Sequence, residues 1–115
     1  MNGKREYIPI VRRGEARKLY VNDILYVTSE SRLLHFFTRE REYTVYGKLD
    51  DICEILPEQF FRLHKSCVIN LDRVEEMRDG CIFFDSETRV STCREKYSQA
   101  LRTYKEYITS PGGKA

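Results

Sequence analysis

The segment from Phe60 to Asp72, FFRLHKSCVINLD, carries the side chains of this chain that are best suited to binding chemistry. Residues 67–69 within it are apolar and can be buried as a short strand. Arg62, His64 and Lys65 carry more hydrogen-bond donors than a protein core could satisfy. We therefore expect a short buried strand that presents cations at its end, and we interpret this end as an edge that contacts nucleic acid.

Other basic side chains also lie near the expected ends of strands and helices. One group flanks a predicted hairpin and contains Arg32, Arg39 and Arg41, and another lies where the last strand turns into a helix and contains Arg94 and Lys96. Arginine in a loop can reach guanine edges through two parallel donors, while lysine more often holds a phosphate. Convergence of these groups with Lys65 on one face would indicate nucleic-acid binding. The alternative for each residue is an ordinary solvated cation.

Enzyme and metal chemistry find little support in the sequence. His35, His64 and the cysteines are potential bases and nucleophiles, but no local pattern marks a catalytic pair, and only a Cys–His pair formed in space stays open. The four cysteines form no Cys-x-x-Cys motif and have no histidine at ligand spacing, which argues against zinc. The glycines form no phosphate-binding loop. We expect no enzymatic activity, no cofactor and no metal.

Composition limits the class of protein. With 115 residues and 41% apolar content, the chain can bury the core of one domain without disulfide bonds. Its formal net charge of +2 is too small to indicate a polyanionic partner, so a nucleic-acid role depends on where the charges lie. The N-terminus lacks an apolar run of the signal-peptide type, and no stretch approaches the roughly 18 apolar residues of a membrane span. We expect a soluble, cytoplasmic protein with reduced thiols.

Strands are predicted over most of the first half of the chain. Short runs of β-branched and aromatic residues are separated by turn signals, which is typical of a strand-rich meander. These runs are 7–11, 18–21, 24–27 and 33–37, and the turn signals are Arg13-Gly14, Asn22-Asp23 and Glu30-Ser31. Pro9 cannot donate to a β-ladder, so the first run should lie at a sheet edge or begin its strand there.

Two hairpins stand out. The first pairs Leu33–Thr38 with Arg41–Tyr46. The second joins strands 74–78 and 81–84 through Asp79-Gly80, the strongest two-residue turn signal of the chain. A further strand is expected over Arg89–Ser91.

Two helices are expected beside these strands. Apolar side chains recur at helical spacing over 49–56, between Gly47 and Pro57, which predicts one short amphipathic helix. The same spacing runs from residue 97 to 108 and predicts a C-terminal helix that packs on a sheet. The segment 110–113 should end this helix and fray.

The basic segment resembles the signature of the LytTR DNA-binding domain, of the LytR/AlgR type. In that family a Phe-x-Arg-x-His-(Arg or Lys)-Ser motif leads into an apolar strand and an asparagine, as it does here through residues 60–70. Asp23–Val27 resembles an early strand of the family, and Tyr46–Leu49 resembles the opening of its short helix. Val90-Ser91, followed by Arg94, resembles its closing strand-to-helix element. The resemblance covers about residues 7 to 108.

This resemblance implies a mainly β protein, with an elongated multi-sheet β fold of LytTR type, one short internal helix and a C-terminal helix. It also implies a bacterial transcriptional regulator of the kind found in response regulators of two-component systems. Its loops would enter successive major grooves of promoter DNA, at direct repeats, with a second copy bound beside the first. Carried over by position, the contacts would come from Lys65, from Arg94 and from the Ser31-Arg32 loop. Auxiliary phosphate contacts are expected from Arg39, Arg41, Arg62 and Lys96, while His64 either contacts DNA or fixes the backbone.

We expect residues 7–108 to form the DNA-binding domain, with flexible segments over 1–6 and 109–115. Because about six residues precede the first strand, we expect no receiver domain in this chain, which is either a stand-alone protein or part of a longer one. The alternative function is a small β-rich protein–protein interaction module that does not bind nucleic acid. Such a module would use its 8 tyrosines and 6 phenylalanines as the binding surface.

Overall fold

The computed structural model describes residues 6–110, which form ten strands in three sheets, two α-helices and two short 3-10 helices. The prediction of a mainly β fold with one short internal helix and a C-terminal helix is confirmed. Backbone contacts divide the chain into two compact units, the first ending at Asn70 and the second beginning at Leu71. The segments 1–5 and 111–115, where flexible ends were predicted, lie outside the described residues.

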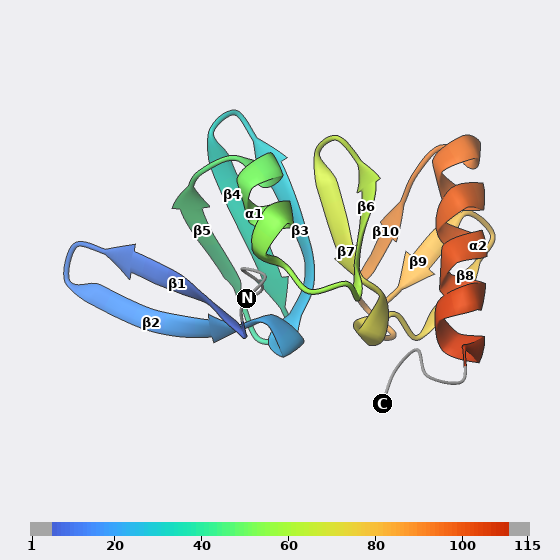
Figure 1. Cartoon of the computed structure of the whole chain (residues 1–115), viewed down its shortest axis with the longest axis horizontal. Coiled ribbons are helices and arrows are strands. Elements are labelled where there is room, and N and C mark those ends of the chain that lie inside the picture. The colour runs from blue at the N-terminus through green and yellow to red at the C-terminus, as the bar shows by residue number, and fades with distance from the viewer. Residues whose placement is uncertain (1–5, 111–115) are drawn as a thin grey trace. The chain divides into compact units, whose positions relative to one another are not determined.

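The first unit holds two antiparallel sheets and a helix (Figure 1). Strands β1 (Tyr7–Arg12) and β2 (Glu15–Tyr20) form a hairpin, and the 3-10 helix η1 (Val21–Asp23) follows it. The larger sheet has the order β5-β4-β3-β7-β6 and consists of β3 (Ile24–Glu30), β4 (Leu33–Thr38), β5 (Glu42–Tyr46), β6 (Phe60–His64) and β7 (Cys67–Asn70). Helix α1 (Leu49–Ile55) connects β5 to β6.

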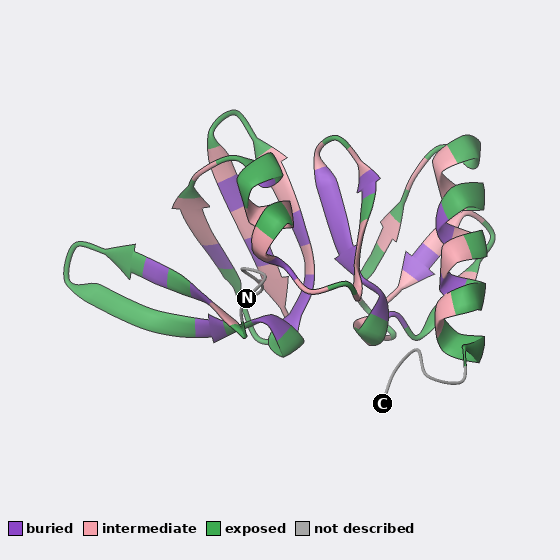
Figure 2. Ribbon diagram, viewed as in Figure 1, coloured by how far each residue is buried: buried purple, intermediate pink, exposed green. Residues whose placement is uncertain are grey.

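The core of the first unit lies between one face of the larger sheet, the β1–β2 hairpin and α1. Alternate side chains of β4 show why this face is buried, since Leu34 and Phe36 are enclosed while their neighbours are partly exposed. Each such side chain contributes about 1.5–3 kcal/mol when fully buried. Strand β7 is buried along its whole length (Figure 2). The enclosed residues are Ile8, Ile10, Leu19, Val21, Ile24, Val27, Leu34, Phe36, Tyr43, Leu49, Leu56 and Val68.

The second unit holds a three-stranded antiparallel sheet and a long helix. The elements are the 3-10 helix η2 (Leu71–Arg73), strands β8 (Glu76–Arg78), β9 (Cys81–Phe83) and β10 (Arg89–Ser91) in the order β10-β9-β8, and helix α2 (Arg94–Thr109). The predicted turn at Asp79-Gly80 is confirmed, because both residues have positive φ, 54° and 80°, as a type I′ turn requires. The hydroxyl of Tyr104 in α2 donates to the carbonyl of Val74, 2.6 Å away.

Some boundaries differ from the sequence predictions. Strand β8 begins at Glu76 and not at Val74, because the Val74 amide closes a turn onto the carbonyl of Leu71, 3.3 Å away. The predicted C-terminal tail starts inside α2, which continues to Thr109. Among residues 6–110, no helix is both long enough and apolar enough to cross a membrane.

Candidate nucleic-acid interface

Three turns of the first unit meet at one end of the larger sheet. Strand β3 pairs antiparallel with both β4 and β7, so the turn after β3 (Ser31-Arg32) and the turn before β7 (Lys65-Ser66) lie at the same end. Strand β5 ends beside the start of β4, where Tyr46 pairs with Leu33, and this brings Gly47-Lys48 to the same end. We call these three pairs of residues the turn cluster.

Backbone hydrogen bonds join the turns of the cluster to one another and to the end of β3. The amide of Gly47 donates to the carbonyl of Arg32, 2.9 Å away, and the amide of Ser29 donates to the carbonyl of Ser66, 3.0 Å away. Ser31 has a φ of 58°, in the left-handed region that non-glycine residues rarely occupy. These contacts fix three separate parts of the chain against one another, so side chains that the turns carry share one rigid support.

The turn cluster presents exposed cations, and two of them, Lys48 and Lys65, line a surface hollow. Arg32, Lys48 and Lys65 are all exposed, and within residues 6–110 none of them forms an ion pair. The hollow has a volume of about 320 Å³ and is lined by Ser29, Ser31, Gly47, Lys48, Leu49, Asp50, Arg62 and Lys65. Unpaired cations around a concave surface are suited to an anionic ligand such as a nucleic-acid phosphate.

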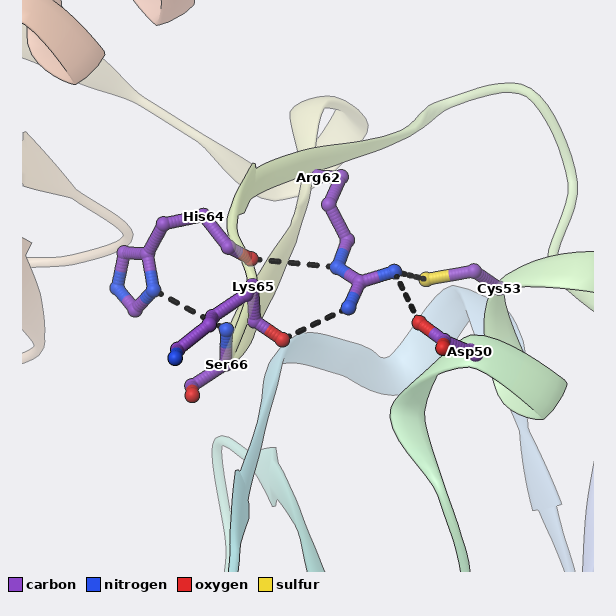
Figure 3. A network of polar contacts seen from close by, with 6 residues as sticks. All are labelled: Asp50, Cys53, Arg62, His64, Lys65 and Ser66. Atoms are coloured by element: carbon purple, nitrogen blue, oxygen red, sulfur yellow. Dashed lines mark hydrogen bonds and ion pairs between the residues drawn. The ribbon is translucent and has the colours of Figure 1, made fainter.

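Arg62 and His64 lie beside the Lys65-Ser66 turn but have partners in the protein (Figure 3). Nη1 of Arg62 lies 3.0 Å from Oδ1 of Asp50, and Nη2 donates to the carbonyl of Lys65, 2.7 Å away. Nδ1 of His64 accepts a hydrogen bond from the amide of Ser66 at 3.2 Å. The ring of His64 therefore holds the backbone of the turn in this structure, and a contact of His64 with DNA stays a prediction.

Arg39 and Arg41 do not join Arg32. They lie in the turn between β4 and β5, at the opposite end of β4, and a six-residue strand separates its ends by roughly 17 Å. The guanidinium of Arg41 lies over the ring of Tyr43, 4.6 Å from its centroid, while Arg39 is exposed. The larger sheet therefore carries cations at both ends, and only one end combines them with the hollow.

Arg94 and Lys96 belong to the second unit, in the first turn of α2. Arg94 is exposed, Lys96 is partly exposed, and neither forms an ion pair within the described part of the chain. Arg78 of the same unit, by contrast, contacts the carboxylates of Glu76 and Asp79, at 2.9 and 3.3 Å. Glu76 is the main cause of the raised pKa of Arg78. Arg94 thus presents an uncompensated charge at the start of a helix.

The potential nucleophiles and bases do not assemble into a catalytic site. All four cysteines are free thiols, and burial raises the pKa of Cys67 to about 12, which makes this thiol a poor nucleophile. Nδ1 of His35 lies 2.5 Å from Oε2 of Glu42, and its Nε2 is buried without a partner. Among residues 6–110, His, Cys, Asp and Glu side chains form no group of three that could hold a metal ion.

Comparison with known sequences places the chain in a family. The sequence profile of the LytTr DNA-binding domain matches residues 14–106, which include every strand from β2 to β10 and most of α2. The chain belongs to the LytTr DNA-binding domain family. The family is one of DNA-binding domains. The resemblance seen in the sequence is therefore confirmed.

Two kinds of relative resemble this LytTr domain. The transcriptional regulatory protein YpdB of Escherichia coli K12 and that of Shigella flexneri are each 31% identical to it over 58 residues, half of the chain. The matched region is 24% of YpdB, so the chain spans about a quarter of these relatives. The solved LytTr DNA-binding domain of a putative methyl-accepting/DNA response regulator from Bacillus cereus superposes with a TM-score of 0.72. That match covers 87% of this chain and 96% of the other at 15% identity, and it confirms the fold.

The tertiary structure adds residues that the sequence did not single out. Lys48 of this LytTr domain joins Lys65 at the hollow, and Asp50 binds Arg62 from the first turn of α1. Lys48 lies in the segment that opens the short helix, but nothing in that segment indicates its neighbours. Knowledge of the antiparallel strand order would have placed Lys48 beside Lys65, because that order decides which turns share an end of the sheet.

Proposed function

We propose that this chain binds duplex DNA as the DNA-binding domain of a transcriptional regulator. The observation that carries the proposal is the set of exposed cations without an ion pair, at Arg32 and Lys65 on turns of the first unit and at Arg94 at the start of α2 in the second. Membership of the LytTr family supports the same conclusion. By contrast, Arg12, Arg62 and Arg78 have carboxylate partners in the protein.

In this proposal Arg32 and Arg94 read base edges and Lys65 holds a phosphate, each from a turn or helix start that enters the major groove. Ser31 and His64 lie next to these groups, and His64 acts by fixing the turn that carries Lys65. Lys48 is an additional phosphate contact, because it lines the same hollow as Lys65. Arg39, Arg41 and Lys96 are auxiliary phosphate contacts with smaller effects. Sequence-specific binding to direct repeats, with a second copy on the DNA, is part of the proposal.

The test is a titration of the protein with random and selected duplexes at salt concentrations between about 50 and 200 mM. We expect binding to weaken steeply as salt rises, since each neutralised phosphate contributes a slope of about −0.9 in a plot of log K against log salt. Lys65→Ala should make this slope shallower by about 0.9, the contribution of one phosphate contact. Arg13→Ala is the matched control, because Arg13 is also exposed in a hairpin turn but lies between β1 and β2, and it should leave the slope unchanged.

A salt-independent failure to bind any duplex would overturn the proposal in favour of a protein-interaction module. The exposed aromatic side chains give that alternative limited support. Among the large hydrophobic residues of the described chain, Tyr46 is 84% exposed and Tyr20 is 48% exposed, whereas Phe36, Phe84, Tyr43 and Tyr104 are buried. If the titration does show binding, selection of bound oligonucleotides from a random pool would identify the DNA site.

A further inference from the structure

We propose that Arg62 is a positioning residue, which ties the Lys65-Ser66 turn to helix α1 and does not itself contact DNA. The inference rests on the proposed function of the turn cluster and assigns a role within it. Figure 3 shows the guanidinium of Arg62 between two parts of the chain, the carbonyls of the turn on one side and α1 on the other. The side chain of Lys65 extends away from this guanidinium.

The donors of Arg62 are largely used inside the protein. Nε donates to the carbonyl of His64 at 3.2 Å and Nη2 donates to the carbonyl of Lys65 at 2.7 Å. Nη1 donates to Oδ1 of Asp50 at 3.0 Å and to Sγ of Cys53 at 3.7 Å. Arginine has five N–H groups, so a single N–H on Nη2 remains. Recognition of a phosphate or a guanine by arginine uses two parallel N–H groups, which Arg62 cannot offer without releasing the turn.

The turn needs this support because the β-ladder is interrupted next to it. Pairing between β6 and β7 shifts its register between Arg62 and His64, so regular ladder bonds do not continue evenly to the turn. The Arg62 guanidinium and the His64 ring supply hydrogen bonds there in their place. The orientation of Lys65 is therefore set in part by the side chain of Arg62, three residues earlier in the chain.

Asp50 supplies the contact that links Arg62 to α1. Its side chain is 80% exposed and that of Arg62 is 36% exposed, and ion pairs in such surroundings add little to stability. The expected role of the pair is geometric: it fixes the guanidinium so that Nε and Nη2 face the carbonyls of the turn. Loss of the pair should therefore affect DNA binding much more than folding.

Asp50→Asn distinguishes a positioning role of Asp50 from a purely electrostatic one, because the two roles predict opposite changes in DNA affinity. Removal of a negative charge beside a DNA-binding surface should strengthen binding if only charge matters. If Asp50 positions the turn through Arg62, binding should weaken by roughly two- to tenfold, in the lower part of the range of couplings between contacting residues. Asp51→Asn is the matched control, since it removes the same charge from the next exposed residue of α1 and does not touch the guanidinium. It should leave binding unchanged or slightly stronger.

Arg62→Gln supplies the second measurement. A positioning role predicts weaker binding with an unchanged salt slope, whereas a direct phosphate contact predicts that the slope falls by about 0.9. In the free protein, the amide resonances of Lys65 and Ser66 should shift and broaden in both Asp50→Asn and Arg62→Gln, while those of Asp51→Asn should match the native protein. This measurement needs no DNA, so it tests whether Arg62 and Asp50 position the Lys65-Ser66 turn even if the native protein fails to bind any duplex.

The inference would be overturned by Asp50→Asn binding DNA as tightly as the native protein, or by a reduced salt slope in Arg62→Gln. Unchanged amide resonances of the turn in Asp50→Asn would also overturn it. If Arg62→Gln does not fold, the Asp50→Asn and Asp51→Asn pair still decides the question, because both positions are exposed.

Discussion

The side-chain amide of Asn70 donates a hydrogen bond to the carbonyl of Ile24, 2.8 Å away across the larger sheet. Asn70 is fully buried, and its amide also approaches the carbonyl of Val21 at 3.5 Å. The residue therefore closes the end of β7 onto the start of β3. Both carbonyls belong to segments about 46 to 49 positions earlier in the chain.

Asn70→Ala should destabilise the fold, because it removes the buried donor to the carbonyl of Ile24. We expect the free energy of unfolding to fall by about 1–3 kcal/mol. Denaturant unfolding followed by circular dichroism measures this change. Gln99→Ala, an exposed position of α2, is the control and should shift stability by less than about 0.5 kcal/mol. An equal, small change for both variants would contradict the role given to Asn70.

Gly47 has little room for a side chain. A Cβ atom at this position would lie 2.9 Å from Cδ1 of Leu34, which is 1% exposed and cannot move freely. Gly47→Ala should therefore cost about 1–3 kcal/mol of stability through overpacking. Combining it with Leu34→Val should cost less than the sum of the two single changes, because the shorter side chain removes the clash. Strict additivity in thermal or denaturant unfolding would argue against this steric cause.

The Cys67 thiol should make stability sensitive to alkaline pH. Burial raises its pKa from 9.0 to about 12 in the folded state. Below pH 9 the thiol is protonated in both states, so its contribution is fully present. Between pH 9 and 12 the unfolded chain loses the proton first, and stability falls by up to about 1.4 kcal/mol per pH unit. Unfolding measured from pH 8 upward should show a shallower decline in Cys67→Ala than in the native protein, and parallel curves would refute this assignment.

Helix α2 lacks a side-chain cap. Cys93 occupies the N-cap position with extended backbone angles, and its side chain makes no capping hydrogen bond. Cys93→Ser replaces the sulfur by a hydroxyl oxygen, which can accept a hydrogen bond from a backbone amide in the first turn of α2. We expect stability to rise by about 0.5–1 kcal/mol. Cys93→Ala tests whether the gain comes from the hydroxyl, since alanine should give none.

Arg94→Ala tests whether the start of α2 reads sequence. If Arg94 binds a base, affinity for the selected site should fall by about 1–3 kcal/mol while binding to random duplex changes little. A similar loss on every sequence would make Arg94 a backbone contact instead. Arg102→Ala, also exposed on α2, is the matched control and should leave both affinities near the native values.

Local patterns in the sequence determined much of the secondary structure. The Asp79-Gly80 turn, the strand Arg89–Ser91 and the hairpin of β4 with β5 depend on residues close together in the chain, and the structure confirms them. The motif around Lys65 was sufficient to identify the family. Such features follow from turn chemistry and side-chain alternation, which act over a few residues.

Only the tertiary structure decided which of these parts meet. The antiparallel order β5-β4-β3-β7-β6 places the turns at Ser31, Gly47 and Lys65 at one end of the sheet, and it leaves Arg39 at the other end. It also gives Arg62 a partner in α1 rather than leaving all its donors for a ligand. The physical reason is that pairing between distant strands depends on burial of the whole sheet face, a property of the folded chain and not of any short stretch of it.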